Sequence, residues 1–283
     1  MRAAPLPAGI RPSLVDGLFY PAGREACARR VDELLAGSAV PGGAGFAVIS
    51  PHAGYELAGD VMAAAFRSIS LRRVRTAVLI GPVHRDPTDA IFVPESTAFA
   101  TPLGDVPVDA ASVRSLLDSD PLFQANDIPH LEEHCLELQI PFLARLFPGV
   151  SIVPMLVGNN RAATADTLSR SLRLTFAAAG DYTVFVVTAN MASYLVGRDP
   201  EAENALMEDL LGRCDARGML AAVERRQLSA CGVAGMAALL GLCGRGCSVQ
   251  FLARGSSRGR EEEPGKTVYN AAAGFSPGGR ARE

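Results

Sequence analysis

The chain has 283 residues, of which 48% are hydrophobic, enough for one large buried core or two modest ones. Its formal net charge is −3 and no basic stripe follows any predicted element, which argues against nucleic acid as the main partner. The longest apolar stretch, "ACGVAGMAALLGLC", is shorter than the roughly 20 residues that a bilayer span requires. We therefore expect neither a nucleic-acid-binding protein nor a membrane protein.

The cysteines and the N-terminus indicate the compartment. The six cysteines form no CxxC pair and no dense framework. The opening residues "MRAAPLPAGIRPS" lack the apolar core of a secretory signal. Both features favour a cytoplasmic protein with reduced thiols.

Apolar periodicity predicts strands and helices that alternate along most of the chain. The predicted helices are 24–37, 57–69, 109–117, 130–147, 162–180, 199–214 and 233–243. The predicted strands are 45–50, 76–81, 89–95, 151–158, 182–190, 248–255 and 267–275. Asp109 is the expected cap of its helix, Pro94 places strand 89–95 near a sheet edge, and Pro141 predicts a kink or break near Gln139.

This alternation predicts an α/β fold with a mainly parallel central sheet and helices on both faces. No linker is strong enough to divide the chain, so we expect a single domain over residues 1–283. Residues 1–9 and 276–283 are expected to be flexible. Ligands of such sheets bind outside the carboxyl ends of the strands.

Two of the four histidines, His52 and His84, follow buried strands directly. Neutral imidazole is the commonest transition-metal ligand, so two histidines at neighbouring strand ends suggest a metal site or a general-base pair. The alternative is that each histidine only binds loop backbone at the end of its strand. The matching strand–proline contexts of the two histidines favour the functional interpretation. The stretch "VVTANMASY" occupies the same kind of position after a third strand.

His134 and Cys231 are two further candidates. His134 lies in an acid-rich segment, where it could either face a cleft or belong to a helical turn that compensates the helix dipole. His130 is expected at the surface near the start of that helix. Cys231 precedes an apolar helix, whose N-terminus would stabilise a thiolate, but most cysteines are simply small buried residues. The chain has no GxSxG elbow, no phosphate-binding GxxxxGK[ST] loop and no convincing GxGxxG motif.

Seven segments in order along the chain resemble the Memo family, whose bacterial and archaeal members are called AmmeMemoRadiSam system protein B. They are "IRPSLVDGLFYPA", "ISPHAGYELAG", "VLIGPVHR", "ATPLGDVPVD", "EEHCLELQIPFL", "IVPMLVG" and "TVYNAAAGF". Each segment alone would be weak, but together they run nearly from end to end. The resemblance implies a fold like that of the class III extradiol dioxygenases, whose members hold non-haem iron.

The resemblance also implies a metal pocket of three histidines and a cysteine. Two of the histidines correspond to His52 and His84, and the cysteine corresponds to Cys231. The third histidine belongs to a Ser-Asp-Phe-x-His motif, which aligns with "TANMAS", so Asn190 replaces the aspartate and Ser193 replaces the histidine. Two histidines and a thiolate can still bind Zn, Fe(II) or Cu, but they are not the 2-His-1-carboxylate set of oxygen-activating iron.

Three functions follow as hypotheses. The first is a Memo-family protein with a pocket of His52, His84, Asn190, Ser193 and Cys231 that binds a divalent metal weakly in a redox or modification pathway. Its partners, by resemblance, would be an AMMECR-type protein and a radical SAM enzyme. The second is a non-catalytic binding or scaffold protein on a degenerate enzyme fold. The third is a metal oxygenase or a hydrolase with His84 or His134 as general base.

Overall fold

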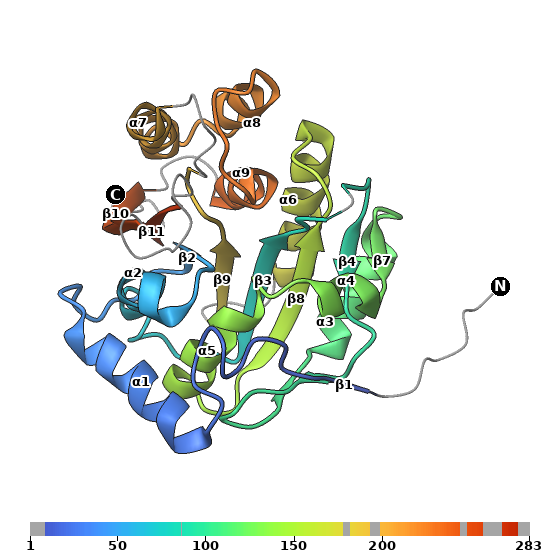
Figure 1. The fold of residues 1–283 in the computed structure, drawn as a ribbon. Coiled ribbons are helices and arrows are strands. Elements are labelled where there is room, and N and C mark those ends of the chain that lie inside the picture. Colours follow the sequence, from blue (N-terminus) through green and yellow to red (C-terminus); the bar gives the residue numbers. More distant parts are fainter. Residues whose placement is uncertain are drawn as a thin grey trace, which may run out of the picture.

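The computed structural model in Figure 1 describes residues 9–85, 87–177, 182–192, 199–243, 248–256 and 268–276. Ser193 lies outside these residues, as do most of the terminal residues that we expected to be flexible. Within the described ranges, no helix is both long and apolar enough to cross a lipid bilayer.

An eight-stranded sheet forms the centre of the molecule, in the order β10-β11-β2-β9-β3-β8-β4-β7. Its strands are β2 (Ala47–Ser50), β3 (Thr76–Pro82), β4 (Ile91–Val93), β7 (Phe123–Ala125), β8 (Ser151–Val157), β9 (Thr183–Thr188), β10 (Ser248–Ser256) and β11 (Tyr269–Ser276). The pairs β2–β9, β9–β3 and β3–β8 are parallel, as is β4–β7. The pairs β10–β11, β11–β2 and β4–β8 are antiparallel. The predicted parallel sheet is thus confirmed at its centre, while antiparallel pairs occur toward both sides.

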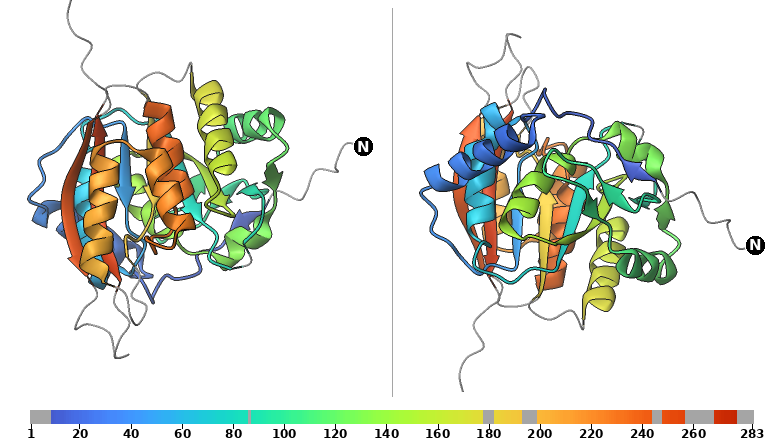
Figure 2. Two further views of the ribbon diagram at one scale, coloured as in Figure 1. Left: turned by 90° about the horizontal axis from the view of Figure 1, so that it is seen from above. Right: turned by 90° about the horizontal axis from the view of Figure 1, so that it is seen from below.

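Helices cover both faces of this sheet, as Figure 2 shows from two opposite directions. One face packs against α1 (Arg24–Gly37), α2 (Tyr55–Arg67) and α5 (Ile140–Leu146). The other packs against α3 (Ala110–Ser119), α6 (Ala162–Phe176), α7 (Pro200–Gly212), α8 (Ala216–Glu224) and α9 (Val233–Cys243). Because both faces are buried, the central strands are apolar without interruption rather than alternating with polar residues.

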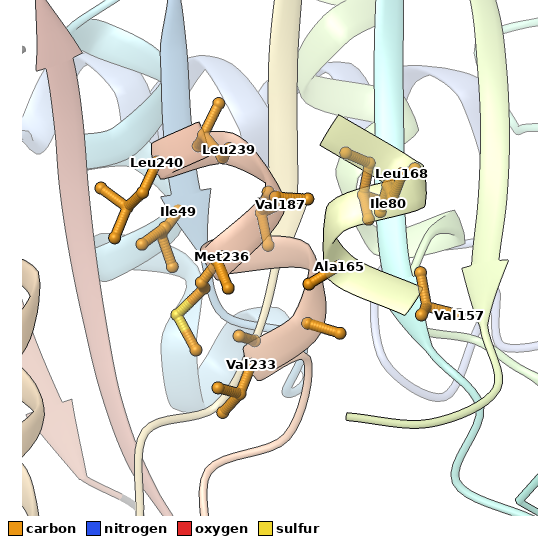
Figure 3. Packing of buried hydrophobic residues seen from close by; sticks show 14 of the residues in the cluster. Ile49, Ile80, Val157, Ala165, Leu168, Val187, Val233, Met236, Leu239 and Leu240 are labelled. Carbon is orange, nitrogen blue, oxygen red and sulfur yellow. The ribbon is translucent and has the colours of Figure 1, made fainter. Parts of the chain in front are cut away.

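Figure 3 shows the packing on the second of these faces. Ile49, Val187 and Ile80 come from β2, β9 and β3 and lie beneath α9 and α6. Met236 of α9 and Leu168 of α6 are fully buried in the same cluster. This packing fixes the three adjacent parallel strands relative to one another, and therefore fixes the positions of the loops that leave their carboxyl ends.

A small second sheet and several short elements were not predicted from the sequence. The second sheet has the order β1-β5-β6, with β1 at Ile10–Arg11, β5 at Ala98–Phe99 and β6 at Val106–Pro107. Strand β7 and helix α8 were also missed. These four strands have only two or three residues, too short to show a hydrophobic period, so their structure depends on partners elsewhere in the chain. Helix α8 has nine residues, so length does not explain why it was missed.

The predicted single helix over 130–147 is wrong. The chain forms α4 (Asp127–Glu132), then a 3₁₀ turn (Glu137–Gln139), then α5. Pro141 lies in the first turn of α5, where a proline needs no helical hydrogen-bond partner. The helix changes from 3₁₀ to α at Gln139, where a kink or break was expected, but the actual break lies earlier, between Glu132 and Glu137.

The surface position expected for His130 is also wrong, because its exposed fraction is only 1%. The backbone carbonyl of His130 accepts a hydrogen bond from Arg11 Nε at 2.8 Å, so β1 covers this part of α4. The His130 ring packs edge-on against Phe99, with ring centroids 5.8 Å apart. Burial, together with the Arg11 charge, lowers its pKa to about 3. Two of the smaller predictions hold: Asp109 caps α3 by accepting from Ser112 N, and β4 lies next to the edge strand.

Candidate metal centre

The candidate site lies at the carboxyl ends of three neighbouring strands. In the order β2-β9-β3, the strands end at Ser50, Thr188 and Pro82. Each strand is followed within a few residues by a polar side chain: His52 after β2, Asn190 after β9 and His84 after β3. The sheet topology therefore brings together residues that are far apart in the sequence, at the edge where parallel sheets bind ligands.

Cys231 joins the two histidines at this edge. His52, His84 and Cys231 each offer one ligand atom, and these atoms all lie within 4.8 Å of one another. Cys231 Sγ lies 3.5 Å from His52 Nε2, and the two imidazole rings meet edge to face with centroids 5.2 Å apart. The structure thus brings together the three residues for which the sequence suggested a metal site.

Backbone contacts with Asn190 hold Cys231 in place. Asn190 N donates a hydrogen bond to Cys231 Sγ at 3.1 Å, and Cys231 N donates to Asn190 O at 3.3 Å. Gly232 follows with φ +70°, and a Cβ there would lie 2.9 Å from Thr188 O. Only glycine meets both conditions without strain, so Gly232 lets the chain turn from the cysteine into α9 directly against the end of β9.

His84 is held by a carboxylate. Its Nδ1 lies 2.8 Å from Glu133 Oε2, and its backbone N–H donates to Glu133 Oε1 at 2.5 Å. The Glu133 side chain is only 4% exposed, and the hydrogen bonds from His84 outweigh burial, so its pKa is lowered. An anionic acceptor on Nδ1 places the ring hydrogen there and leaves Nε2 as the nitrogen free to bind a metal.

His52 has neutral partners instead. It is 3% exposed, its Nδ1 lies 2.8 Å from Thr188 Oγ1, and its backbone N–H donates to Asn190 Oδ1 at 3.1 Å. With Nδ1 bonded to threonine, Nε2 faces the sulfur of Cys231. Asn190 therefore has a positioning role in the site, although the resemblance suggested it only as a replacement for an aspartate.

The charges of the cluster stabilise a thiolate. Burial alone would raise the pKa of Cys231, but the charge of His52 and hydrogen bonds from both histidines lower it to about 6. Conversely, hydrogen bonds to Cys231 and Glu133 outweigh burial and raise the pKa of His84 to about 10. A thiolate is the form of cysteine that binds metals, and a metal bound at His84 Nε2 would displace the proton that this nitrogen carries below its raised pKa.

A cleft of about 640 Å³ opens beside the cluster. Its lining includes His52, His84, His134, Asn190, Arg85 and Phe19. The His134 ring packs edge-on against Phe19 at 4.9 Å and lies 6.4 Å from the His52 ring, measured between centroids. Burial and the charge of His52 lower the pKa of His134, which favours its neutral form. His134 therefore lines the cleft and is not one of the three candidate ligands.

The donor set fits a transition metal. Two imidazole nitrogens and one thiolate are ligands that suit Zn, Cu and Fe, and three protein ligands leave a coordination position open toward the cleft. Among the residues that the structure describes, no carboxylate belongs to this group of ligands, and the nearby Glu133 is engaged by His84. The set therefore differs from the 2-His-1-carboxylate arrangement of oxygen-activating iron enzymes.

Sequence reasoning missed two supporting residues, Thr188 and Gln139, and gave Glu133 no role. Thr188 is the last residue of an apolar strand, and a hydroxyl at that position was the available signal. Gln139 was noted only as the place of a helix break. The partners of all three residues lie far away in the chain, and their roles depend on contacts that spacing alone does not reveal.

Comparisons with known proteins show which family the sequence matches. The family model "Memo-like protein" matches residues 11–258. A "MEMO1 family protein" of Thermotoga neapolitana is 27% identical over 82% of this chain and 88% of its own length. A second, from Aeropyrum pernix, is 29% identical over 78% of this chain and 83% of its own.

A solved structure, the uncharacterized protein JW3007 from Escherichia coli K12, is similar in fold, with a TM-score of 0.51 and 13% identity. The match covers 80% of this chain and 98% of that one. At this identity the likeness concerns the fold alone. The family match extends over most of the sequence, including the strand ends that carry His52 and His84 and the loop that carries Cys231, and on this basis the chain belongs to the Memo family.

Proposed function

We propose that this Memo-family protein binds a divalent transition metal, Zn, Fe or Cu, through His52, His84 and Cys231, and acts on a small molecule in the adjoining cleft within a redox or modification pathway. The observation that carries the proposal is the approach of three ligand atoms to within 4.8 Å of one another. The carboxylate on His84 Nδ1 supports it, because metal-binding histidines commonly donate their second ring N–H to a carboxylate.

A bound metal would supply a Lewis acid or an activated water at the open position. The surrounding residues would do the rest. Glu133 holds the ring hydrogen of His84 on Nδ1, and Asn190 holds the backbone of both His52 and Cys231. His134, neutral and facing the cleft, offers one donor or acceptor to the bound molecule.

Metal titration tests the proposal directly. Untagged protein is stripped of metal, loaded with Zn(II) or Co(II), and analysed by elemental analysis and by competition with a chromophoric chelator. We expect one metal per chain and, with Co(II), a thiolate-to-metal charge-transfer band. Cys231→Ser should abolish the band, and His52→Ala and His84→Ala should each weaken binding by at least about tenfold. Cys243→Ser is the matched control: this cysteine is only partly buried and lies at the other end of α9.

Failure to bind any metal, with identical behaviour of Cys231→Ser and Cys243→Ser, would reject the metal site. It would favour the alternative of a binding or scaffold protein on a degenerate enzyme fold. The AMMECR-type and radical SAM partners remain proposals from family resemblance. Co-purification from native lysate, compared between the wild type and a His52→Ala/His84→Ala variant, tests whether the pocket takes part in such contacts.

A further inference from the structure

A fully buried amide, that of Gln139, lies behind the His52 side of the site. Its exposed fraction is 0%. Gln139 Nε2 donates to Pro51 O at 2.9 Å and to Thr188 Oγ1 at 3.1 Å, with a third acceptor, Cys135 O, at 3.3 Å. One side chain therefore contacts both the residue before His52 and the hydroxyl that lies on the His52 ring.

The surroundings fix which way this amide points. If it were turned over, its oxygen would face the carbonyl oxygens of Pro51 and Cys135, which have no hydrogen to donate. In the observed orientation Oε1 is buried and has no hydrogen-bond partner among the residues that the structure describes. An unpartnered buried oxygen destabilises the fold, so the amide is retained for the contacts made by its nitrogen.

Thr188 connects the amide to the imidazole. Its hydroxyl receives a hydrogen bond from Gln139 and lies 2.8 Å from His52 Nδ1. Ser50 is its register partner on the adjacent strand β2 and is equally buried, yet Ser50 Oγ has no hydrogen-bond partner within the described part of the chain. Of these two neighbouring buried hydroxyls, that of Thr188 contacts both Gln139 and the His52 ring.

We propose that Gln139 and Thr188 are positioning residues that hold His52 as a metal ligand, an inference that rests on the proposed metal site. A metal bound at Nε2 requires the ring hydrogen of His52 on Nδ1. Thr188 Oγ1 has two lone pairs, so it can accept this hydrogen while it accepts one from Gln139. Through Pro51 O, the same amide also fixes the turn that carries the histidine.

There is a physical reason why Gln139 and Thr188, which support His52, are both uncharged. His84 is supported by a carboxylate and is partly exposed to solvent, with its side chain 39% exposed. His52 is only 3% exposed and directly contacts the Cys231 sulfur. A second carboxylate here would be a further buried negative charge beside a thiolate, which is costly. A hydroxyl oriented by an amide places the ring without adding charge.

The test compares Thr188→Val, which keeps the shape and removes the hydroxyl, with Thr188→Ser, which keeps the hydroxyl. Ser50→Ala is the matched control, since it removes the neighbouring hydroxyl. We expect Thr188→Val and Gln139→Met to lower Zn(II) affinity by about 10–100-fold, while Thr188→Ser and Ser50→Ala stay near the wild type. The ¹⁵N shifts of the His52 ring should change in Thr188→Val and not in Ser50→Ala, and those of His84 should change in neither.

Each result decides the inference. Zn(II) affinity and His52 shifts that are unchanged in Thr188→Val, or altered equally in Ser50→Ala, overturn it while leaving the metal site intact. If the wild type binds no metal, the metal site fails, and the His52 shifts of the metal-free variants still decide whether Thr188 positions the ring. If Thr188→Val does not fold, Thr188→Ser and Gln139→Met are compared in its place: the inference then requires altered His52 shifts in Gln139→Met alone, and unaltered shifts overturn it.

Discussion

Glu133 and Glu137 belong to one short segment, and both are buried carboxylates, but they have different roles. Glu133 binds the backbone and ring of His84 and so supports the candidate metal centre. Glu137 is 0% exposed and accepts hydrogen bonds from Arg11, Tyr20 and the backbone N–H groups of Leu14 and Val15. It therefore fastens the N-terminal segment to the body of the protein.

The contrast shows that position in a motif does not determine the role of a charge. In a continuous helix, residues four apart would lie on one face and share surroundings. Here α4 ends at Glu132, and the 3₁₀ turn starts at Glu137, so the two side chains point to different partners. These partners lie 49 residues away for Glu133 and 126 for the Arg11 side chain bonded to Glu137.

The largest effect that would test this contrast is expected from Glu137→Gln. It leaves the Arg11 guanidinium, which is 1% exposed, without its counter-charge. Removal of one partner from a buried ion pair typically costs about 3–5 kcal/mol of unfolding free energy. Urea denaturation of the metal-free protein measures this loss, and the Zn(II) affinity of the folded variant should remain close to that of the wild type.

An exposed ion pair gives the matched control for Glu137→Gln. Arg145 and Asp32 form two hydrogen bonds, at 2.7 and 2.9 Å, but their side chains are 48% and 47% exposed. Asp32→Asn should therefore cost less than about 1 kcal/mol. Equal losses in the two variants would show that burial of the Glu137 pair does not matter.

Glu133→Gln should have the opposite profile. The amide no longer supplies an anionic acceptor for His84 Nδ1, and loss of such a supporting carboxylate typically lowers metal affinity by about 10–100-fold. Its effect on the unfolding free energy should be smaller than that of Glu137→Gln, because no buried arginine loses its partner. The same Zn(II) competition titration and urea denaturation are used. A folded Glu137→Gln variant that loses as much affinity as Glu133→Gln would remove the distinction between them.

Much of the site could be predicted from the sequence because it depends on strand ends. Apolar runs bounded by proline or glycine marked β2 and β3, and a parallel sheet places the ends of its strands at one edge. His52 and His84 follow from that reasoning alone. Cys231 required family resemblance, because its position before α9 does not show that the loop returns to the end of β9.

The remaining features depend on contacts between distant segments. Arg11 reaches from β1 to both sides of the break between α4 and α5, where it donates to His130 O, Glu133 O and the Glu137 carboxylate. A two-residue strand has no periodicity that could reveal it. For the same reason, the supporting roles of Glu133, Thr188 and Gln139 could be recognised only once the fold was known.

The pH dependence of metal-free protein should separate the two carboxylates further. The pKa of His84 is raised to about 10, mainly by its hydrogen bond to Cys231 and then by Glu133. Its contribution to stability is therefore complete below its ordinary pKa near 6.5 and is lost as pH rises through about 10. In Glu133→Gln this loss should begin at lower pH, whereas Glu137→Gln should titrate like the wild type.

NMR titration of the His84 ring measures this shift, which should be partial because the Cys231 contact remains. The contribution of Cys231 to stability depends on pH in the opposite direction and gives a second measurement. Its pKa is lowered from 9.0 to about 6, so its contribution is complete above pH 9 and is lost as pH falls through about 6. Ultraviolet absorbance of the thiolate follows this step, and Cys231→Ser should remove it. A His84 titration that is the same in both glutamate variants would contradict the assigned roles.

The smallest effect is expected at Tyr20, which is one of the residues that Glu137 binds in the N-terminal segment. Its hydroxyl donates to Glu137 Oε1 at 2.7 Å, and burial together with the Glu137 charge raises its pKa strongly. In Tyr20→Phe the carboxylate keeps Arg11 and two backbone donors, so the loss should be only about 1 kcal/mol of unfolding free energy. Tyr182→Phe, at a ring 44% exposed, should change less.

The contacts of Glu137 with Arg11, Tyr20 and the backbone of Leu14 and Val15 hold the segment that carries Phe19 beside His134. A Tyr20→Phe variant with wild-type Zn(II) affinity would show that these contacts and the metal centre are energetically separate. A drop in affinity would show that they are coupled through the wall of the cleft.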